Sequence, residues 1–351
     1  MAKVKRNLFS RLSFAAAALT VSALLAISYV SALINPEIGW FFSLFGMLFM
    51  PLAFVTLLFF LLALKLRSRM WLLLLLILLP SAHLAGRYIQ LRQAKSEDGE
   101  LKIVSYNVGL FGKFGAPKPE TADSIAAFLL SLDADVICLQ EVQLYNSIST
   151  EDWLENSFPG YRAEYFFNTD RFGKYGNLTL SRYPVSGKGK FSFENSSNVA
   201  FYTDIDFPGG TYRIYNCHFE SYSISIPHLL TNVQEEEELK DTGRKMRRSI
   251  RQRPSQVNLV LKDIESSDHK AIVLGDFNDT PLSYTYHRLS KGRKDSFVAA
   301  GDGFGASFRD FWPLLRIDYI LLPRGLKAIS HKTLKKPYSD HYPVIVTCNE
   351  S

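Results

Sequence analysis

Hydrophobic and polar positions divide the chain into two unlike parts. Residues 12–34, 40–64 and 70–86 are nearly continuous apolar runs, whereas the chain after Lys95 mixes apolar and polar stretches as a water-exposed domain does. The first two runs exceed the roughly 20 residues that a helix needs to cross the hydrocarbon core of a bilayer. The third is near the lower limit and carries Pro80 and His83. The pattern predicts about three transmembrane helices within residues 1–95, followed by a folded domain over residues 96–351.

The first run could also be a cleaved signal peptide. It is longer than the apolar region of a typical signal peptide, and a second apolar run follows almost at once. The residues before it and those between the second and third runs are basic (Lys3, Lys5, Arg6 and Arg11, then Lys65, Arg67 and Arg69). Because basic flanks stay in the cytoplasm, this favours a multi-pass membrane protein with an extracytoplasmic folded domain. Arg87, Arg92 and Lys95 would then lie outside and oppose that orientation.

Shorter patterns predict the elements of the folded domain. A helix over residues 121–132, with Thr121 as its N-cap, and a polar helical stretch over 228–262 interrupt a series of strands. The predicted strands cover residues 102–106, 135–139, 177–180, 201–205, 212–217, 271–274, 317–322 and 344–348. Strands that alternate irregularly with helices indicate a layered α/β or α+β domain.

Charge is distributed as unevenly as hydropathy. The chain has 40 basic and 34 acidic residues, of which 10 basic and 3 acidic residues lie in residues 1–99. The remainder therefore has 30 basic and 31 acidic residues and a net charge of −1. The folded domain therefore lacks the overall basic character typical of nucleic-acid binding. Its acidic block at 235–238 and the basic residues at 244–253 are typical of a solvated helix face, and a phosphate- or headgroup-binding surface is the alternative. Cys138, Cys217 and Cys348 have no metal-site spacing, which favours buried thiols.

Polar side chains recur at predicted strand ends. They are Asn107, Glu141, His218, Asp276 with Asn278, Asp318, and Asp340 with His341. Each alone has a plain structural explanation, such as a turn, a surface ion pair or a buried histidine. Together they place carboxylates, amides and imidazoles where a sheet presents side chains to a cleft. Oxygen ligands of this kind suit Mg²⁺, whereas the HExxH spacing of zinc enzymes and the GxxxxGK[ST] phosphate loop are both missing.

The ordered motifs Asn, Gln-Glu, His, Gly-Asp-x-Asn, Arg-x-Asp-Tyr and Ser-Asp-His resemble those of the endonuclease/exonuclease/phosphatase superfamily over about residues 101–350. The resemblance implies an α+β fold, a four-layer α/β/β/α sandwich, with a metal site at one end. It also implies metal binding by Asn107, Glu141 and Asp340. The implied catalytic residues are His218 for the leaving group, Asp276 and Asn278 for the attacking water, and His341, oriented by Asp318, for the phosphate.

The resulting expectation is a membrane-anchored phosphoesterase that uses Mg²⁺ or Mn²⁺ and hydrolyses phosphodiester or phosphomonoester bonds by in-line attack of water. Its expected partners are the bilayer and a phosphoester substrate. A lipid headgroup or small phosphoester is favoured, an extracytoplasmic nuclease acting on DNA or RNA is the alternative, and a catalytically inactive interaction module is a third reading.

Overall fold

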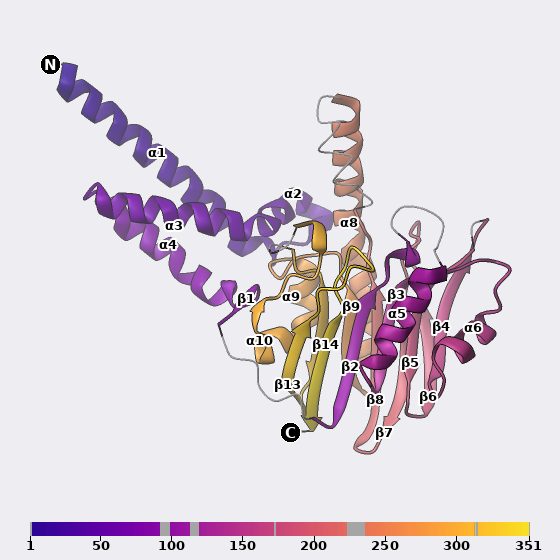
Figure 1. Cartoon of the computed structure of the whole chain (residues 1–351). Helices are drawn as coiled ribbons and strands as arrows, with labels where there is room; N and C mark the ends of the chain where they lie inside the picture. The colour runs from indigo at the N-terminus through magenta and orange to yellow at the C-terminus, as the bar shows by residue number, and fades with distance from the viewer. Residues whose placement is uncertain are drawn as a thin grey trace.

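Two six-stranded sheets pack face to face and carry helices on their outer surfaces in the computed structural model (Figure 1), which describes residues 2–91, 99–112, 119–171, 173–222, 236–311, 313 and 315–350. In spatial order the first sheet contains β13 (Leu326–Thr333), β14 (Val344–Glu350), β2 (Leu101–Asn107), β3 (Val136–Leu144), β5 (Lys174–Ser181) and β4 (Arg162–Thr169). The second contains β10 (Arg293–Asp295), β12 (Asp318–Pro323), β9 (Lys270–Asp276), β8 (Gly210–His218), β7 (Ala200–Phe207) and β6 (Val185–Phe191). A small third sheet pairs β1 (Ile89–Gln90) with β11 (Gly303–Phe304).

Apolar side chains from both sheets form the central core. Ile103 and Val136 of the first sheet meet Ile214 and Ile272 of the second, and all four are fully buried. Strands buried on both faces read as continuous apolar runs, which is why the sequence reveals them. The three cysteines lie in buried positions as free thiols, as predicted.

Helices complete the outer layers. The first sheet is covered by α5 (Pro119–Ser131) and α6 (Thr150–Ser157), and the second by α8 (Glu236–Ser266) and α9 (Tyr284–Ser290). The remaining short helices are η1 (Gly109–Phe111), α10 (Ser296–Ala300) and η2 (Arg309–Phe311). This arrangement confirms the predicted four-layer α/β/β/α sandwich.

The described starts of α5 and α8 differ from the starts of the helices predicted there. The helix predicted from residue 121 is described from Pro119, two residues earlier. Thr121 is therefore inside the helix and is not its N-cap. Residues 228–235 of the predicted polar helix lie outside the described residues, and α8 is described from Glu236.

The apolar N-terminal part forms α1 (Ala2–Ser31), α2 (Pro36–Met47), α3 (Phe49–Lys65) and α4 (Met70–Ala85). The prediction of one continuous helix over 40–64 is wrong, because α2 and α3 meet at an angle of 52° on either side of Leu48. Within the described residues, Phe9–Ser31 is long and apolar enough to cross a membrane, and a second crossing exists if the bent pair counts as one. With 16 residues, α4 is shorter than a typical span. The expected three spans are thus reduced to one or two.

These helices dock on the sandwich at the loop that follows β9. Leu25, Phe49 and Tyr88 form a buried cluster with Leu282 of that loop. The approach is so close at Gly46 that a Cβ atom there would lie 2.3 Å from the carbonyl oxygen of Leu282. The N-terminal helices therefore contact the segment that continues from the Asp276 strand.

Candidate active site

Strand register brings the predicted residues together at one edge of the sandwich. In the second sheet, His218 on β8 lies opposite Asp276 on β9, and Asp276 lies opposite Asp318 on β12. In the first sheet, the parallel pairing of β2 and β3 sets Asn107 opposite Gln140, next to Glu141. The Asn107 amide joins the sheets, because its Nδ2 donates to Glu141 Oε1 at 3.1 Å and to Asp276 Oδ2 at 3.0 Å.

A bulge turns Glu141 towards the site. The β3–β5 register shifts between Leu139 and Val142, and Glu141 has a φ of 53°. Positive φ is uncommon for a residue with a side chain and is often found at functional positions. Gln140, which precedes it, instead donates from Nε2 to Asn216 Oδ1 at 2.8 Å between the sheets. The bulge thus leaves Gln140 in the core and turns Glu141 towards the site, where 30% of the Glu141 side chain is exposed.

Asp276 is the centre of the site. Its side chain is 1% exposed, and it accepts hydrogen bonds from Asn107, from the Asn278 backbone N–H at 2.8 Å and from Asn278 Nδ2 at 3.2 Å. Burial raises the pKa of Asp276 to about 6, against the opposing effect of His341. A carboxylate with such a pKa can accept a proton near neutral pH.

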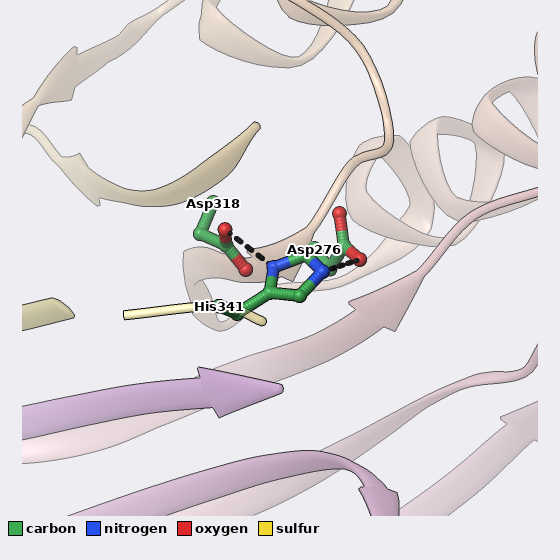
Figure 2. A group of neighbouring side chains, drawn as sticks. All are labelled: Asp276, Asp318 and His341. Atoms are coloured by element: carbon green, nitrogen blue, oxygen red, sulfur yellow. Dashed lines mark hydrogen bonds and ion pairs between the residues drawn. The ribbon is translucent and has the colours of Figure 1, made fainter. Parts of the chain in front are cut away.

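Asp318 and His341 form a buried pair beside Asp276 (Figure 2). His341 Nδ1 lies 2.9 Å from Asp318 Oδ2, and its Nε2 faces Asp276 Oδ2 at 3.7 Å. Burial by itself lowers the pKa of His341, but the carboxylates of Asp318 and Asp276 outweigh it and hold that pKa well above its ordinary value. The ring is therefore an imidazolium that presents an N–H to the site.

The side chains of Ser307, Phe308 and Ser339 hold this pair in place. The hydroxyl of Ser307 accepts from the backbone N–H of Asp318 at 3.0 Å, and Phe308 packs edge-on against the His341 ring. Ser339, two residues before His341, donates to the Asn107 carbonyl at 2.9 Å and accepts from the His341 N–H. The loop before β14 is thus tied to the end of β2.

The second histidine has the opposite protonation. His218 Nε2 lies 3.4 Å from Glu141 Oε1 and 3.7 Å from Asp276 Oδ2. Burial lowers the pKa of His218, so the ring is neutral. Asn198 Nδ2 lies 2.9 Å from that Nε2 and donates to the Phe219 carbonyl, so Nε2 of His218 accepts the hydrogen bond. The sequence does not single out Asn198, because it belongs to no motif and reaches the site only where the residues before β7 lie beside the end of β8.

The charges at the site suit a hard divalent cation. Burial raises the pKa of Glu141, and the nearby carboxylates of Asp340 and Asp318 raise it further. Such repulsion between acids is what a bound cation relieves, and the oxygen donors of Glu141, Asp340 and Asn107 suit Mg²⁺ or Mn²⁺. Within the described residues, one group of three acid and histidine side chains has ligand atoms that all lie within 4.8 Å of one another, and it consists instead of Asp276, Asp318 and His341. In that group Asp318 and His341 already bind each other.

Contacts link seven of the eight predicted site residues directly: Asn107, Glu141, His218, Asp276, Asn278, Asp318 and His341. Asp340 lies beside them, with its Oδ1 3.2 Å from the Ser339 hydroxyl oxygen, and a Cβ atom on Gly109 would lie 3.2 Å from the same Oδ1. Gly109 has a φ of 56°, so a side chain there would be unfavourable for two reasons.

Solved structures share this fold at low sequence identity. An endonuclease/exonuclease/phosphatase from Beutenbergia cavernae aligns with a TM-score of 0.55 and 16% identity, covering 72% of each chain. The human nocturnin catalytic domain with bound sulfate aligns with a TM-score of 0.53 and 15% identity, covering 75% of this chain and 96% of that domain. A functionally unknown conserved protein from Enterococcus faecalis aligns with a TM-score of 0.52 and 14% identity, covering 72% of this chain and all of that one, 100%.

No curated protein matches the chain. Residues 10–88 match a domain of unknown function (DUF8431), which covers most of the N-terminal helices. The Endonuclease/Exonuclease/phosphatase family model matches residues 104–341, more than half of the chain, and spans every residue of the site described above. The chain therefore belongs to the Endonuclease/Exonuclease/phosphatase family.

Proposed function

We propose that this protein is a membrane-anchored, divalent-metal-dependent phosphoesterase that hydrolyses a phosphoester bond by attack of water. One observation carries the proposal. Asp276, a buried carboxylate with its pKa raised to about 6, lies 3.7 Å from the Nε2 atoms of two histidines that differ in protonation. Titratable groups whose pKa values are driven apart by their surroundings are typical of acid–base sites.

Asp276 is placed to act as the base. A water molecule attacks the phosphorus, its proton passes to Asp276, and the bond from phosphorus to the leaving oxygen breaks. Asn107 and Asn278 hold the Asp276 carboxylate by three hydrogen bonds, which fixes its direction before the reaction. Fixed geometry of this kind removes part of the entropic cost of bringing reactants together.

His341 is placed to stabilise the phosphate. Its imidazolium points Nε2–H into the site, and Asp318 keeps both its charge and its orientation. A positive donor aimed at the place where negative charge develops lowers the barrier. His218 differs, because its Nε2 accepts from Asn198. It must first gain a proton before it can donate one to a leaving group.

Glu141, Asp340 and Asn107 would hold the divalent cation. When bound, Mg²⁺ or Mn²⁺ supplies charge neutralisation of the phosphate oxygens and lowers the pKa of coordinated water. Asn107 would have to offer its Oδ1, which here accepts from the Gly109 N–H at 3.0 Å.

A substrate at the membrane surface, a lipid headgroup or a small phosphoester, is favoured. Two observations support it: the N-terminal helices pack against Leu282 in the loop that follows Asn278, and residues 100–351 carry a net charge of only −1, from 30 basic and 31 acidic residues. The basic residues in the first part of α1, from Lys3 to Arg11, favour a cytoplasmic N-terminus, and an odd number of crossings would then put the active site outside the cytoplasm. A nuclease would instead need a locally basic cleft.

The test is hydrolysis by the full-length protein in detergent micelles, with Mg²⁺ or Mn²⁺ compared with a chelator. The substrates are an aryl phosphodiester, an aryl phosphomonoester, phospholipids, plasmid DNA and RNA. Asp276→Asn removes the proposed base, and Asp302→Asn, at an exposed aspartate, is the matched control. We expect metal-dependent turnover that falls about 10²–10⁴-fold in Asp276→Asn, the usual range for a general base, and is unchanged in the control.

Turnover without added metal, or an equal rate in Asp276→Asn, would contradict the proposed mechanism. Cleavage of DNA or RNA with a steep salt dependence, and of no lipid, would select the nuclease.

A further inference from the structure

A groove of about 590 Å³ lies between the end of α1 and the helical layer of the sandwich. It is lined by Leu33, two residues after the end of α1, by Leu261 and Ile264 of α8, and by Tyr284, the first residue of α9. No residue that contacts Asp276 lines it, so the groove is separate from the candidate active site. Its volume is within the usual range for small-molecule sites.

Basic side chains also line the groove. Arg288, Lys291 and Arg293 line it, with Glu265 as the single acid among the lining residues. Within the part of the chain that the structure describes, none of the three cations forms an ion pair. Arg293 Nη1 donates to the Leu289 carbonyl at 2.7 Å, so its charge is not neutralised.

The neighbouring side chains show the same excess of positive charge. Arg288 Nη1 lies 3.4 Å from the Tyr284 hydroxyl, which is a neutral partner. Partial burial lowers the pKa of His287, which also lines the groove, and Arg87, Arg288 and Lys291 lower it further. An additional positive charge is thus disfavoured here, and a bound anion would be favoured.

We propose that this groove binds the phosphate-bearing headgroup of an anionic lipid, with the acyl chains lying along α1. Leu33 is 63% exposed, and the exposed apolar side chains continue along the helix with Val30 and Leu19. A pocket lined by both basic and apolar side chains, beside an apolar helix long enough to cross a bilayer, matches the two ends of a phospholipid. Basic pockets beside membrane helices bind lipid headgroups by this combination of charge and apolar contact. The proposal concerns binding alone and does not require that the lipid be hydrolysed.

The experiment is native mass spectrometry of the full-length protein released from neutral detergent micelles that contain phosphatidylglycerol at a series of mole fractions, with chelator present. Arg288→Gln/Lys291→Gln removes two exposed or half-exposed charges from the groove. The matched control, Arg324→Gln/Lys327→Gln, removes two exposed charges, one from the turn after β12 and one from the start of β13. Each lost cation near a membrane surface weakens anionic-lipid binding by about 1 kcal/mol, so the groove variant should bind roughly thirtyfold more weakly.

Three further arms distinguish the source of the phosphate and the nature of the site. Phosphatidylcholine replaces the anionic lipid, inorganic phosphate is added as a free competitor, and Arg288→Lys/Lys291→Arg keeps the charge. The site is supported if the protein selectively retains phosphatidylglycerol, if the groove variant loses this retention, and if the control and the charge-keeping variant show it. Equal loss in the control, or full retention in the groove variant, overturns it. Inorganic phosphate that binds alone and displaces the lipid at equal concentration overturns the lipid assignment.

Discussion

The pairing of Asp318 with His341 makes the sharpest test of the catalytic arrangement. Asp318→Asn keeps the shape of the side chain, and its amide oxygen can still accept from His341 Nδ1, which lies 2.9 Å from Asp318 Oδ2. The negative charge is lost. Because Asp318 is the largest of the groups that raise the pKa of His341, the imidazolium should lose its proton at lower pH in the variant.

The size of the effect follows from the contact. A hydrogen bond to a charged group contributes about 1.5–3 kcal/mol, and about 1.4 kcal/mol corresponds to one pKa unit, so the pKa of His341 should fall by about one to two units. Activity that needs the imidazolium is lost as pH rises through its pKa. The alkaline limb of the profile should therefore move to lower pH by that amount. Poorer orientation of the ring adds a loss of about 10²-fold in kcat, comparable to the removal of one preorganised donor.

The assay is kcat and kcat/KM for an aryl phosphodiester across the pH range at saturating Mn²⁺, with Asp302→Asn as the control for loss of an exposed carboxylate. Far-UV circular dichroism confirms that the variant is folded. A kcat within threefold of the unmodified protein, together with an unmoved alkaline limb, would refute the role assigned to the pair.

Three further predictions concern stability. Arg316→Ala should lower the free energy of unfolding by about 3–5 kcal/mol, because it leaves Asp295 buried without the arginine that donates two hydrogen bonds to it. Urea denaturation measures this change, and a loss below 1 kcal/mol would contradict the prediction. His331 is buried, with its pKa lowered to about 3, so it is neutral when folded and gains a proton on unfolding below its ordinary pKa of 6.5. The free energy of unfolding should therefore fall by up to about 1.4 kcal/mol for each pH unit as the pH is lowered from 6.5 to 3. His331→Asn should reduce that slope, which urea midpoints measured across this pH range will show. Gly46→Ala should lower Tm by several degrees, because its Cβ would lie 2.3 Å from the Leu282 carbonyl, whereas an unchanged Tm in a thermal scan would mean that the helices do not dock there.

Much of the fold could be predicted from the sequence, because its determinants are local. The strands of the central core are short apolar runs, as at Ile103 and Ile272, and the two strands that carry these residues end at Asn107 and Asp276. The edge strands β4, β6 and β13 were missed, since their half-exposed residues show weak or mixed alternation. The lengths of the apolar runs predicted too many candidate membrane spans, because hydropathy alone does not reveal the bend at Leu48.

The sequence by itself therefore determined the kinds of residue at the site and their order along the chain. Only the tertiary structure decided that Asn107 bridges Glu141 and Asp276 across two sheets, and that Asn198 holds His218. The basic groove beside α1 also exists only in the tertiary structure. The physical reason is that such contacts depend on strand register, a bulge and helix docking, which join segments far apart in the chain and leave no local pattern.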